Sequence, residues 1–184
     1  MVHRERKAGL NGAGGVGIMV KRNVNFVQIH DFDNLNLELV CIKIKIEQED
    51  VYIVSYYNPP DQPLCHELFE KLNNIKFILC GGLNSKSFAY GCKTSNQNGK
   101  ILDKIANLKN IIRLSDGSTT YKSFSNNKED ILDYIFSESS MIKNFYSFEK
   151  MQQCLMNSNH YPLRIKFGDQ IERNEQLLND KPKF

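Results

Sequence analysis

A charged side chain inside an apolar stretch is the first feature of this sequence that could do chemistry. Asp133 lies among apolar neighbours in residues 131–136, a run whose β-branched and aromatic side chains predict a strand. A carboxylate in such a strand is costly unless a specific partner satisfies it. His160, in the polar segment Ser158-Asn159-His160, is the natural candidate. The sequence therefore predicts a contact between two residues that lie far apart in the chain.

A second polar side chain follows directly on a buried strand. Residues 77–80 form a short apolar run that ends at the Gly81-Gly82 pair, which is typical of a strand that stops at a turn. Asn84 comes two residues later, on a loop held by that strand, where binding and catalytic groups are commonly found. A plain exit from strand to loop explains the same pattern, so these residues alone leave both interpretations open.

An aromatic residue, Tyr57, stands at the end of another strand pattern. Pro59 and Pro60 follow it, and a central strand must end here because proline cannot donate to a sheet ladder. By its own chemistry Tyr57 is only an aromatic side chain at a strand end. A structural role and a functional role explain it equally well.

These segments together resemble the endonuclease/exonuclease/phosphatase superfamily, in the version found in insect-type non-LTR retrotransposons. Residues around Asp133 (Leu-Asp-Tyr-Ile-Phe) are similar to the strand whose aspartate orients a histidine, and those around His160 are similar to the family's Ser-Asp-His-x-Pro strand. Tyr57 takes the position of the tyrosine in a Tyr-x-Pro motif. The loop resembles Gly-Asp-(Phe/Leu)-Asn-(Ala/Ser) and its continuation, here Gly81, Gly82, Leu83, Asn84, Ser85, Lys86, Ser87, Tyr90, Gly91, Cys92, Asn98 and Gly99.

The resemblance implies roles for four residues in a phosphodiesterase site. His160, kept cationic by Asp133, would stabilise charge that grows on phosphoryl oxygens. Asn84 and Tyr57 would donate hydrogen bonds to the same phosphate or position the attacking water. In the family the reaction is Mg²⁺-dependent nicking of a DNA phosphodiester to prime reverse transcription.

The sequence departs from the family pattern at the positions that would activate water. Gly82 stands where the family has an aspartate, and Asn159 replaces the aspartate beside the histidine. The family's metal-binding glutamate lies upstream of Gly14, where this chain has too few residues to hold it. Mg²⁺ is usually held by one or two carboxylates, so we expect no tightly bound metal. Because a positioned acid or base is worth about 10²- to 10⁴-fold in rate, we expect weak or absent catalysis.

Composition leaves the partner open. The 184 residues fit one domain, and a net charge of +3 is too small to argue by itself for nucleic acid. Five cysteines without a Cys-x-x-Cys pair indicate reduced side chains, which predicts an intracellular protein, cytoplasmic or nuclear. No window approaches the roughly 18 apolar residues of a membrane span, so we expect no membrane partner.

The order of elements predicts a mixed α/β fold. A helix is expected from Pro63 to Leu72 with Asp61 as its cap, and a second over residues 101–108. Alternation over residues 40–47 predicts a half-buried strand whose lysines face solvent. Further β-type runs lie at residues 16–21, 25–30, 51–57, 110–114 and 119–124. The resemblance implies a four-layered α/β sandwich of two packed, mainly antiparallel sheets flanked by helices, here with its N-terminal strands missing.

Three segments are expected along the chain. Residues 1–13 would be a flexible lead-in, residues 14–167 the endonuclease-like domain, incomplete at its N-terminus, and residues 168–184 a linker or disordered tail. Gly12, Gly14 and Gly17 spell Gly-x-Gly-x-x-Gly, but a dinucleotide loop must follow a strand and open a helix. Polar residues precede these glycines and β-type residues follow them, so we expect no cofactor loop.

The sequence thus predicts a retrotransposon-derived endonuclease-like domain that is impaired or inactive. One alternative is a catalytically dead module that still binds DNA through Lys43, Lys45 and the phosphate pocket. Another is a decayed mobile-element fragment without function. In a full-length element a fused reverse transcriptase would be the partner, although this sequence carries no reverse transcriptase motif.

Overall fold

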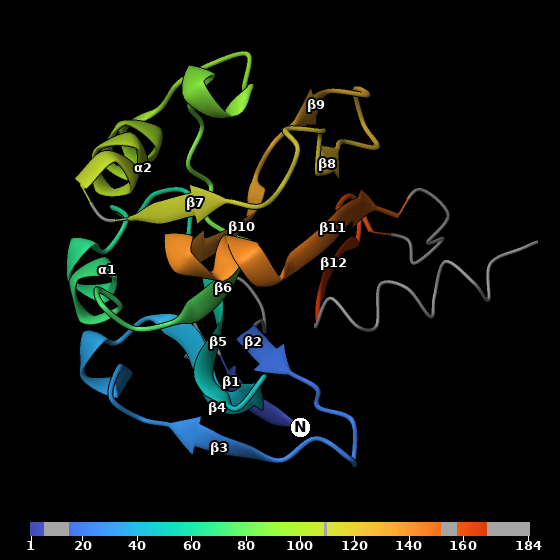
Figure 1. Ribbon diagram of the computed structural model, residues 1–184. Helices are drawn as coiled ribbons and strands as arrows, with labels where there is room; N and C mark the ends of the chain where they lie inside the picture. The colour runs from blue at the N-terminus through green and yellow to red at the C-terminus, as the bar shows by residue number, and fades with distance from the viewer. Residues whose placement is uncertain (6–14, 109, 152–157, 169–184) are drawn as a thin grey trace, which may run out of the picture.

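The computed structural model describes residues 1–5, 15–108, 110–151 and 158–168. Figure 1 shows the α-helices on one side of a stack of strands and small strand pairs on the other. The helices are α1 (His66–Lys71) and α2 (Gln97–Leu108). The strands are β1 (Val2–Glu5), β2 (Gly15–Ile18), β3 (Phe26–Ile29), β4 (Glu38–Ile46), β5 (Glu49–Tyr57), β6 (Phe77–Gly82), β7 (Ile111–Arg113), β8 (Tyr121–Lys122), β9 (Glu129–Asp130), β10 (Asp133–Glu138), β11 (Phe145–Lys150) and β12 (Leu163–Phe167).

A six-stranded sheet forms the centre of the fold, in the order β3-β4-β5-β6-β10-β7. Only β5 and β6 run parallel, and the segment that joins them contains α1. The other neighbours in this sheet are antiparallel. Three two-stranded sheets complete the described strands: β1–β2, β8–β9 and β11–β12.

Side chains on the two faces of the central sheet enter different cores, because successive strand residues point in opposite directions. Leu39, Cys41 and Leu79 lie in the same cluster as the buried side chains of α1 and α2. On the opposite face, Val40 and Ile42 pack against β1 and β2. Val51, Ile78 and Ile135 on that face pack against apolar side chains of β11 and β12.

The predicted mixed α/β sandwich is confirmed, with a mainly antiparallel central sheet between helices on one face and strand pairs on the other. Both described α-helices belong to one cluster with the same face of that sheet. Neither is long and apolar enough to cross a membrane.

Two expectations about strands need correction. Val2–Glu5 was assigned to the flexible lead-in, yet it forms β1, whose Val2 packs with Val40 and Ile42. One apolar residue in a four-residue strand is too short a pattern to reveal it. Residues 40–47 were predicted to expose one face, but Cys41 on that face is only 1 % exposed because the helices cover the first half of β4. Two other predictions fall outside the described residues. They concern the rest of the lead-in with Gly12 and Gly14, at residues 6–14, and the tail, at residues 169–184.

The first helix begins later than predicted. α1 starts at His66, and Cys65 before it is extended, with φ −73° and ψ 106°. The reason is a contact from a distant residue. Asn98 accepts a hydrogen bond from the Leu64 backbone N–H (2.9 Å) and donates one to the Gln62 carbonyl oxygen (2.8 Å). These bonds hold residues 62–64 out of the helix.

Candidate functional site

The predicted site residues converge where three central elements meet. Tyr57 ends β5, Gly82 ends β6, and Asp133 begins β10. Asp133 lies directly opposite Gly82 in the antiparallel pairing of β10 with β6. His160 reaches the same place through a backbone bridge to Tyr121 at the start of β8. Residues from four separate parts of the sequence therefore share one edge of the fold.

The contact predicted between His160 and Asp133 is present. The Nδ1 atom of His160 lies 2.7 Å from Oδ2 of Asp133. The hydrogen bond to this carboxylate raises the pKa of the His160 imidazole above its ordinary value, against a smaller opposing effect of burial. The histidine side chain is 47 % exposed and that of Asp133 20 % exposed. Nδ1 of the ring contacts the carboxylate, so Nε2 is the ring atom left to donate a hydrogen bond to another group when the imidazole is protonated.

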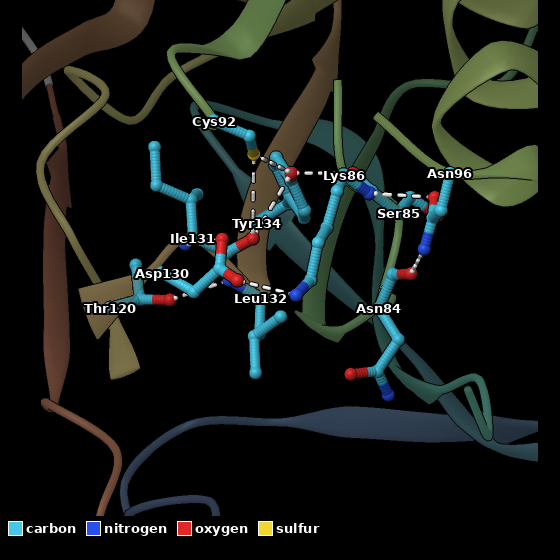
Figure 2. Close-up of polar contacts among 10 residues, drawn as sticks. All are labelled: Asn84, Ser85, Lys86, Cys92, Asn96, Thr120, Asp130, Ile131, Leu132 and Tyr134. Atoms are coloured by element: carbon cyan, nitrogen blue, oxygen red, sulfur yellow. Dashed lines mark hydrogen bonds and ion pairs between the residues drawn. The ribbon is translucent and has the colours of Figure 1, made fainter. Parts of the chain in front are cut away.

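Asn84 is fixed through both its side chain and its backbone. Its φ of 49° is left-handed, a conformation that asparagine tolerates better than most residues. The side-chain Nδ2 donates to the Asn58 carbonyl oxygen (2.8 Å), and the backbone carbonyl oxygen accepts from Asn96 (2.8 Å). Figure 2 shows the Asn84 amide pointing away from the contacts that hold its loop. The amide is thus placed by its surroundings before any ligand arrives.

The loop after Asn84 rests on a set of contacts that the sequence analysis did not find (Figure 2). The buried Tyr134 hydroxyl donates to the Ser85 carbonyl oxygen (2.6 Å), and burial raises the pKa of this phenol. Lys86 forms an ion pair with Asp130, whose side chain is 9 % exposed. Asn96 accepts hydrogen bonds from the backbone N–H groups of Lys86 (3.0 Å) and Gly99 (2.8 Å), so it caps α2 and ties that helix to the loop.

Of these residues, only Asn96 left a signal in the sequence. An asparagine directly before the first residue of a helix, which accepts a hydrogen bond from the backbone N–H three residues later, is a typical capping pattern. The partners of Tyr134 and Lys86 leave none, because they lie on segments that meet only in the folded chain.

Tyr57 lies beside the position where the family has an aspartate. A β-carbon built on Gly82 would lie 3.4 Å from Cδ2 of Tyr57 and 3.3 Å from Oδ1 of Asp133. A side chain at residue 82 would therefore point between these two groups. Tyr57 also lines a cavity of about 200 Å³, together with Arg4, Glu38 and Asn58.

Asn159 is, with Gly82, the other position that departs from the family pattern. Its backbone contributes to the fold. Its carbonyl oxygen accepts a hydrogen bond from the Lys122 N–H (2.7 Å). Its side-chain Oδ1 is buried and has no hydrogen-bond partner among the described residues. The amide thus sits next to His160 without a structural contact through its oxygen.

The positions at this edge that match the family pattern supply only one carboxylate, that of Asp133, to a magnesium ion. Mg²⁺ is usually anchored by one or two carboxylates in near-octahedral geometry. The carboxylate of Asp133 already accepts from His160, Gly82 offers no side chain, and Asn159 offers a neutral amide. Within the described ranges no three His, Cys, Asp or Glu side chains gather closely enough to hold a metal ion.

The lysines considered for DNA binding lie away from this edge. Lys43 and Lys45 both pair with Asp50, at 3.0 and 3.2 Å. Asp50 is near the start of β5 and Tyr57 is its last residue, seven positions later. At about 3.3 Å per strand residue the two ends are roughly 23 Å apart. These lysines and the His160 pair therefore cannot contact the same phosphate.

Comparison with known proteins identifies the family and the fold of this chain. A family model described as endonuclease-reverse transcriptase matches residues 51–164. No curated protein matches the sequence. Among solved structures, the endonuclease domain of TRAS1, a telomere-specific non-LTR retrotransposon, is similar with a TM-score of 0.69 and 20 % identity, over 82 % of this chain and 71 % of that one.

Two further structures share the fold at lower similarity. The 3′ phosphatase NExo from Neisseria, bound to a product DNA hairpin, has a TM-score of 0.57 and 12 % identity, over 82 % of this chain and 72 % of that one. An AP endonuclease from Archaeoglobus fulgidus has a TM-score of 0.54 and 12 % identity, over 79 % of this chain and 70 % of that one.

Proposed function

This chain belongs to the endonuclease-reverse transcriptase family of the endonuclease/exonuclease/phosphatase superfamily, and from that premise we propose that it binds a DNA phosphodiester but hydrolyses it weakly or not at all. The observation that carries the proposal is the contrast at one sheet edge. His160, Asp133 and Asn84 are held in place, whereas Gly82 puts no side chain between Asp133 and Tyr57.

The held side chains suit the recognition of a phosphate. A cationic His160 would donate from Nε2 to a phosphoryl oxygen, where it stabilises negative charge. Asn84 would donate from the amide hydrogen that its bond to Asn58 leaves over, and Tyr57 from its hydroxyl. Each donor is charge-stabilising, and none of them is a base of the kind that removes a proton from water at neutral pH.

Hydrolysis needs groups that these residues do not supply. A general base contributes about 10²- to 10⁴-fold, and a metal ion adds several kcal/mol of charge stabilisation. The two losses combine only partly, because such groups act as a unit. Their combined effect would still leave activity near background.

The partner proposed for the domain is DNA, contacted at this edge and not through Lys43 and Lys45. The family's description couples an endonuclease to a reverse transcriptase, so we extend the proposal to a reverse transcriptase in the same element. An intracellular setting suits the free cysteines at positions 41, 65, 80 and 92.

Nicking of supercoiled plasmid DNA in Mg²⁺ tests the proposal. The chain as written and His160→Ala should both nick at the background rate. His66→Ala is the matched control, because His66 is another half-exposed histidine, paired with Glu70 on α1. Mg²⁺-dependent nicking that His160→Ala abolishes and His66→Ala preserves would contradict the proposal.

A further inference from the structure

One buried residue, Thr120, connects Asp133, His160 and Asn84. Thr120 is 1 % exposed and lies just before β8. Its Oγ1 accepts hydrogen bonds from the backbone N–H groups of Leu132 and Asp133, each at 3.0 Å. Its own N–H donates to the Asp130 carbonyl oxygen (3.0 Å), and its carbonyl oxygen accepts from the Tyr161 N–H (2.8 Å). Figure 2 shows its side chain directed at the turn that leads into β10.

These bonds reach each residue proposed to face the phosphate. Asp133 is held directly, through its own N–H. Asn84 is held through Leu132, whose N–H donates to Thr120 and whose carbonyl oxygen accepts from the Asn84 N–H (3.3 Å).

His160 is held from two sides. Its neighbour Tyr161 is bonded to the Thr120 carbonyl oxygen. The ring of Tyr121, which follows Thr120, packs edge-on against the imidazole with centroids 5.0 Å apart. The histidine segment thus makes two backbone hydrogen bonds with the β8 region, one on each side of the bridge between Tyr121 and His160. One starts at the Thr120 carbonyl oxygen, and the other is donated by the Lys122 N–H to the Asn159 carbonyl oxygen (2.7 Å).

We infer that Thr120 is the positioning residue that sets Asp133, His160 and Asn84 at their mutual distances. A hydroxyl oxygen can accept two hydrogen bonds, and here both come from consecutive N–H groups at the first residues of β10. Because Thr120 itself is buried, water cannot easily take the place of its hydroxyl oxygen. The turn into β10 would then relax, and the carboxylate would move relative to the imidazole. Thr120 itself touches no substrate.

The inference builds on the proposed role of the His160 pair, but its test needs neither DNA nor metal. Proton NMR of the imidazole follows the titration of His160, assigned by its loss in His160→Ala. In Thr120→Val, which keeps the side-chain shape without the hydroxyl, the midpoint should shift down toward that of a solvated histidine. Thr120→Ser restores the oxygen and should restore the midpoint. Plasmid nicking by the wild-type chain would refute the proposed function and leave this result untouched.

A matched control separates positioning from general loosening. Two part-buried backbone N–H groups lose their acceptor in Thr120→Val, so Tm should fall by about 5 °C. Leu68→Ala, a fully buried change in α1 on the other face of the sheet, should lower Tm by a similar amount. In that variant the His160 midpoint should equal the wild-type one.

Three results would overturn the inference. The midpoint could stay at the wild-type value in a folded Thr120→Val, or shift equally in Leu68→Ala. If Thr120→Val does not fold, amide hydrogen exchange of the wild-type chain decides. The Leu132 and Asp133 amides must then exchange as slowly as the core of β6, and fast exchange at either would show that the Thr120 oxygen does not hold them.

Discussion

The two halves of the candidate site differ in what their residues do for the fold. We call Asn84, Asp133 and His160 the anchored half, and Gly82 and Asn159 the bare half. In the anchored half the side chains themselves make contacts, since Asn84 donates to Asn58 and His160 contacts Asp133. In the bare half only the backbone takes part. The Gly82 carbonyl oxygen accepts from Asn58 (2.9 Å), and that of Asn159 accepts from Lys122 (2.7 Å).

This difference predicts which positions of the candidate site tolerate substitution. Backbone hydrogen bonds do not depend on the side chain at that position. A change at residue 82 or 159 therefore removes chemistry while the strands stay paired. A change at Asn84 or Asp133 removes chemistry and a structural contact together. Substitutions in the anchored half should therefore lower the stability of the fold more than substitutions in the bare half.

Two glycine substitutions give the largest expected contrast, between the support of the loop that carries Asn84 and the bare half. Gly99 lies in the first turn of α2, against the loop that follows Asn84. A β-carbon on Gly99 would lie 1.7 Å from the Lys86 carbonyl oxygen. Gly99→Ala must push the helix away from the loop, and we expect it to lower the free energy of unfolding by more than about 3 kcal/mol. Urea unfolding followed by circular dichroism measures the change.

Gly82→Ala is the counterpart in the bare half. Its β-carbon would meet Asp133 and Tyr57 at 3.3 and 3.4 Å, which is tight but avoids the backbone. Alanine also favours a strand over glycine by about 0.5–1 kcal/mol. The free energy of unfolding should therefore change by less than about 1 kcal/mol in either direction. Equal losses in the two variants would remove the distinction between the halves.

The second contrast is between two sets of ion pairs. Lys86 and Asp130 form a largely buried pair beside the loop of Asn84, whereas Asp50 pairs with Lys43 and Lys45 at the surface. Asp130→Ala leaves the Lys86 ammonium, 26 % exposed, without its partner, and should cost about 2 kcal/mol. Asp50→Ala removes the partner of Lys43 and Lys45 at a surface position, where solvent screens the ion pair, and should cost clearly less than Asp130→Ala. The difference in Tm between the two variants measures the contrast. A double variant, Lys86→Met with Asp130→Ala, should recover part of the loss.

The sequence predicts those features of the site that follow from local pattern. An aspartate in an apolar strand demands a partner, and this reasoning identified the contact of Asp133 with His160. The glycine pair after residues 77–80 located the end of β6 and the loop of Asn84. Alternation and β-branched content located β4 and β5.

Contacts between distant segments escape such reasoning. Thr120 and Asp130 are ordinary residues of a polar stretch until the β8–β9 pair folds beside β10. The late start of α1 depends on Asn98, which competes with a local pattern that favours helix from Pro63. Cys41 is likewise buried by the helices, and the alternating pattern of β4 contains no information about them.

The smallest expected effect is the pH dependence that the anchored pair adds to stability. Because Asp133 raises the pKa of His160 in the folded chain, the protonated pair stabilises the fold fully below the unfolded pKa of about 6.5, and this stabilisation is lost as pH rises through the folded pKa. The histidine is half-exposed, so the contribution should stay below about 1 kcal/mol. Urea unfolding at pH 5.5 to 8.5, with His160→Gln as reference, isolates it. Higher pH is avoided because burial raises the pKa of Cys80 to about 11, and the unfolded thiol would ionise first. A wild-type curve parallel to that of His160→Gln would show that the contact carries no net energy, and that the anchored half is held by its backbone bonds alone.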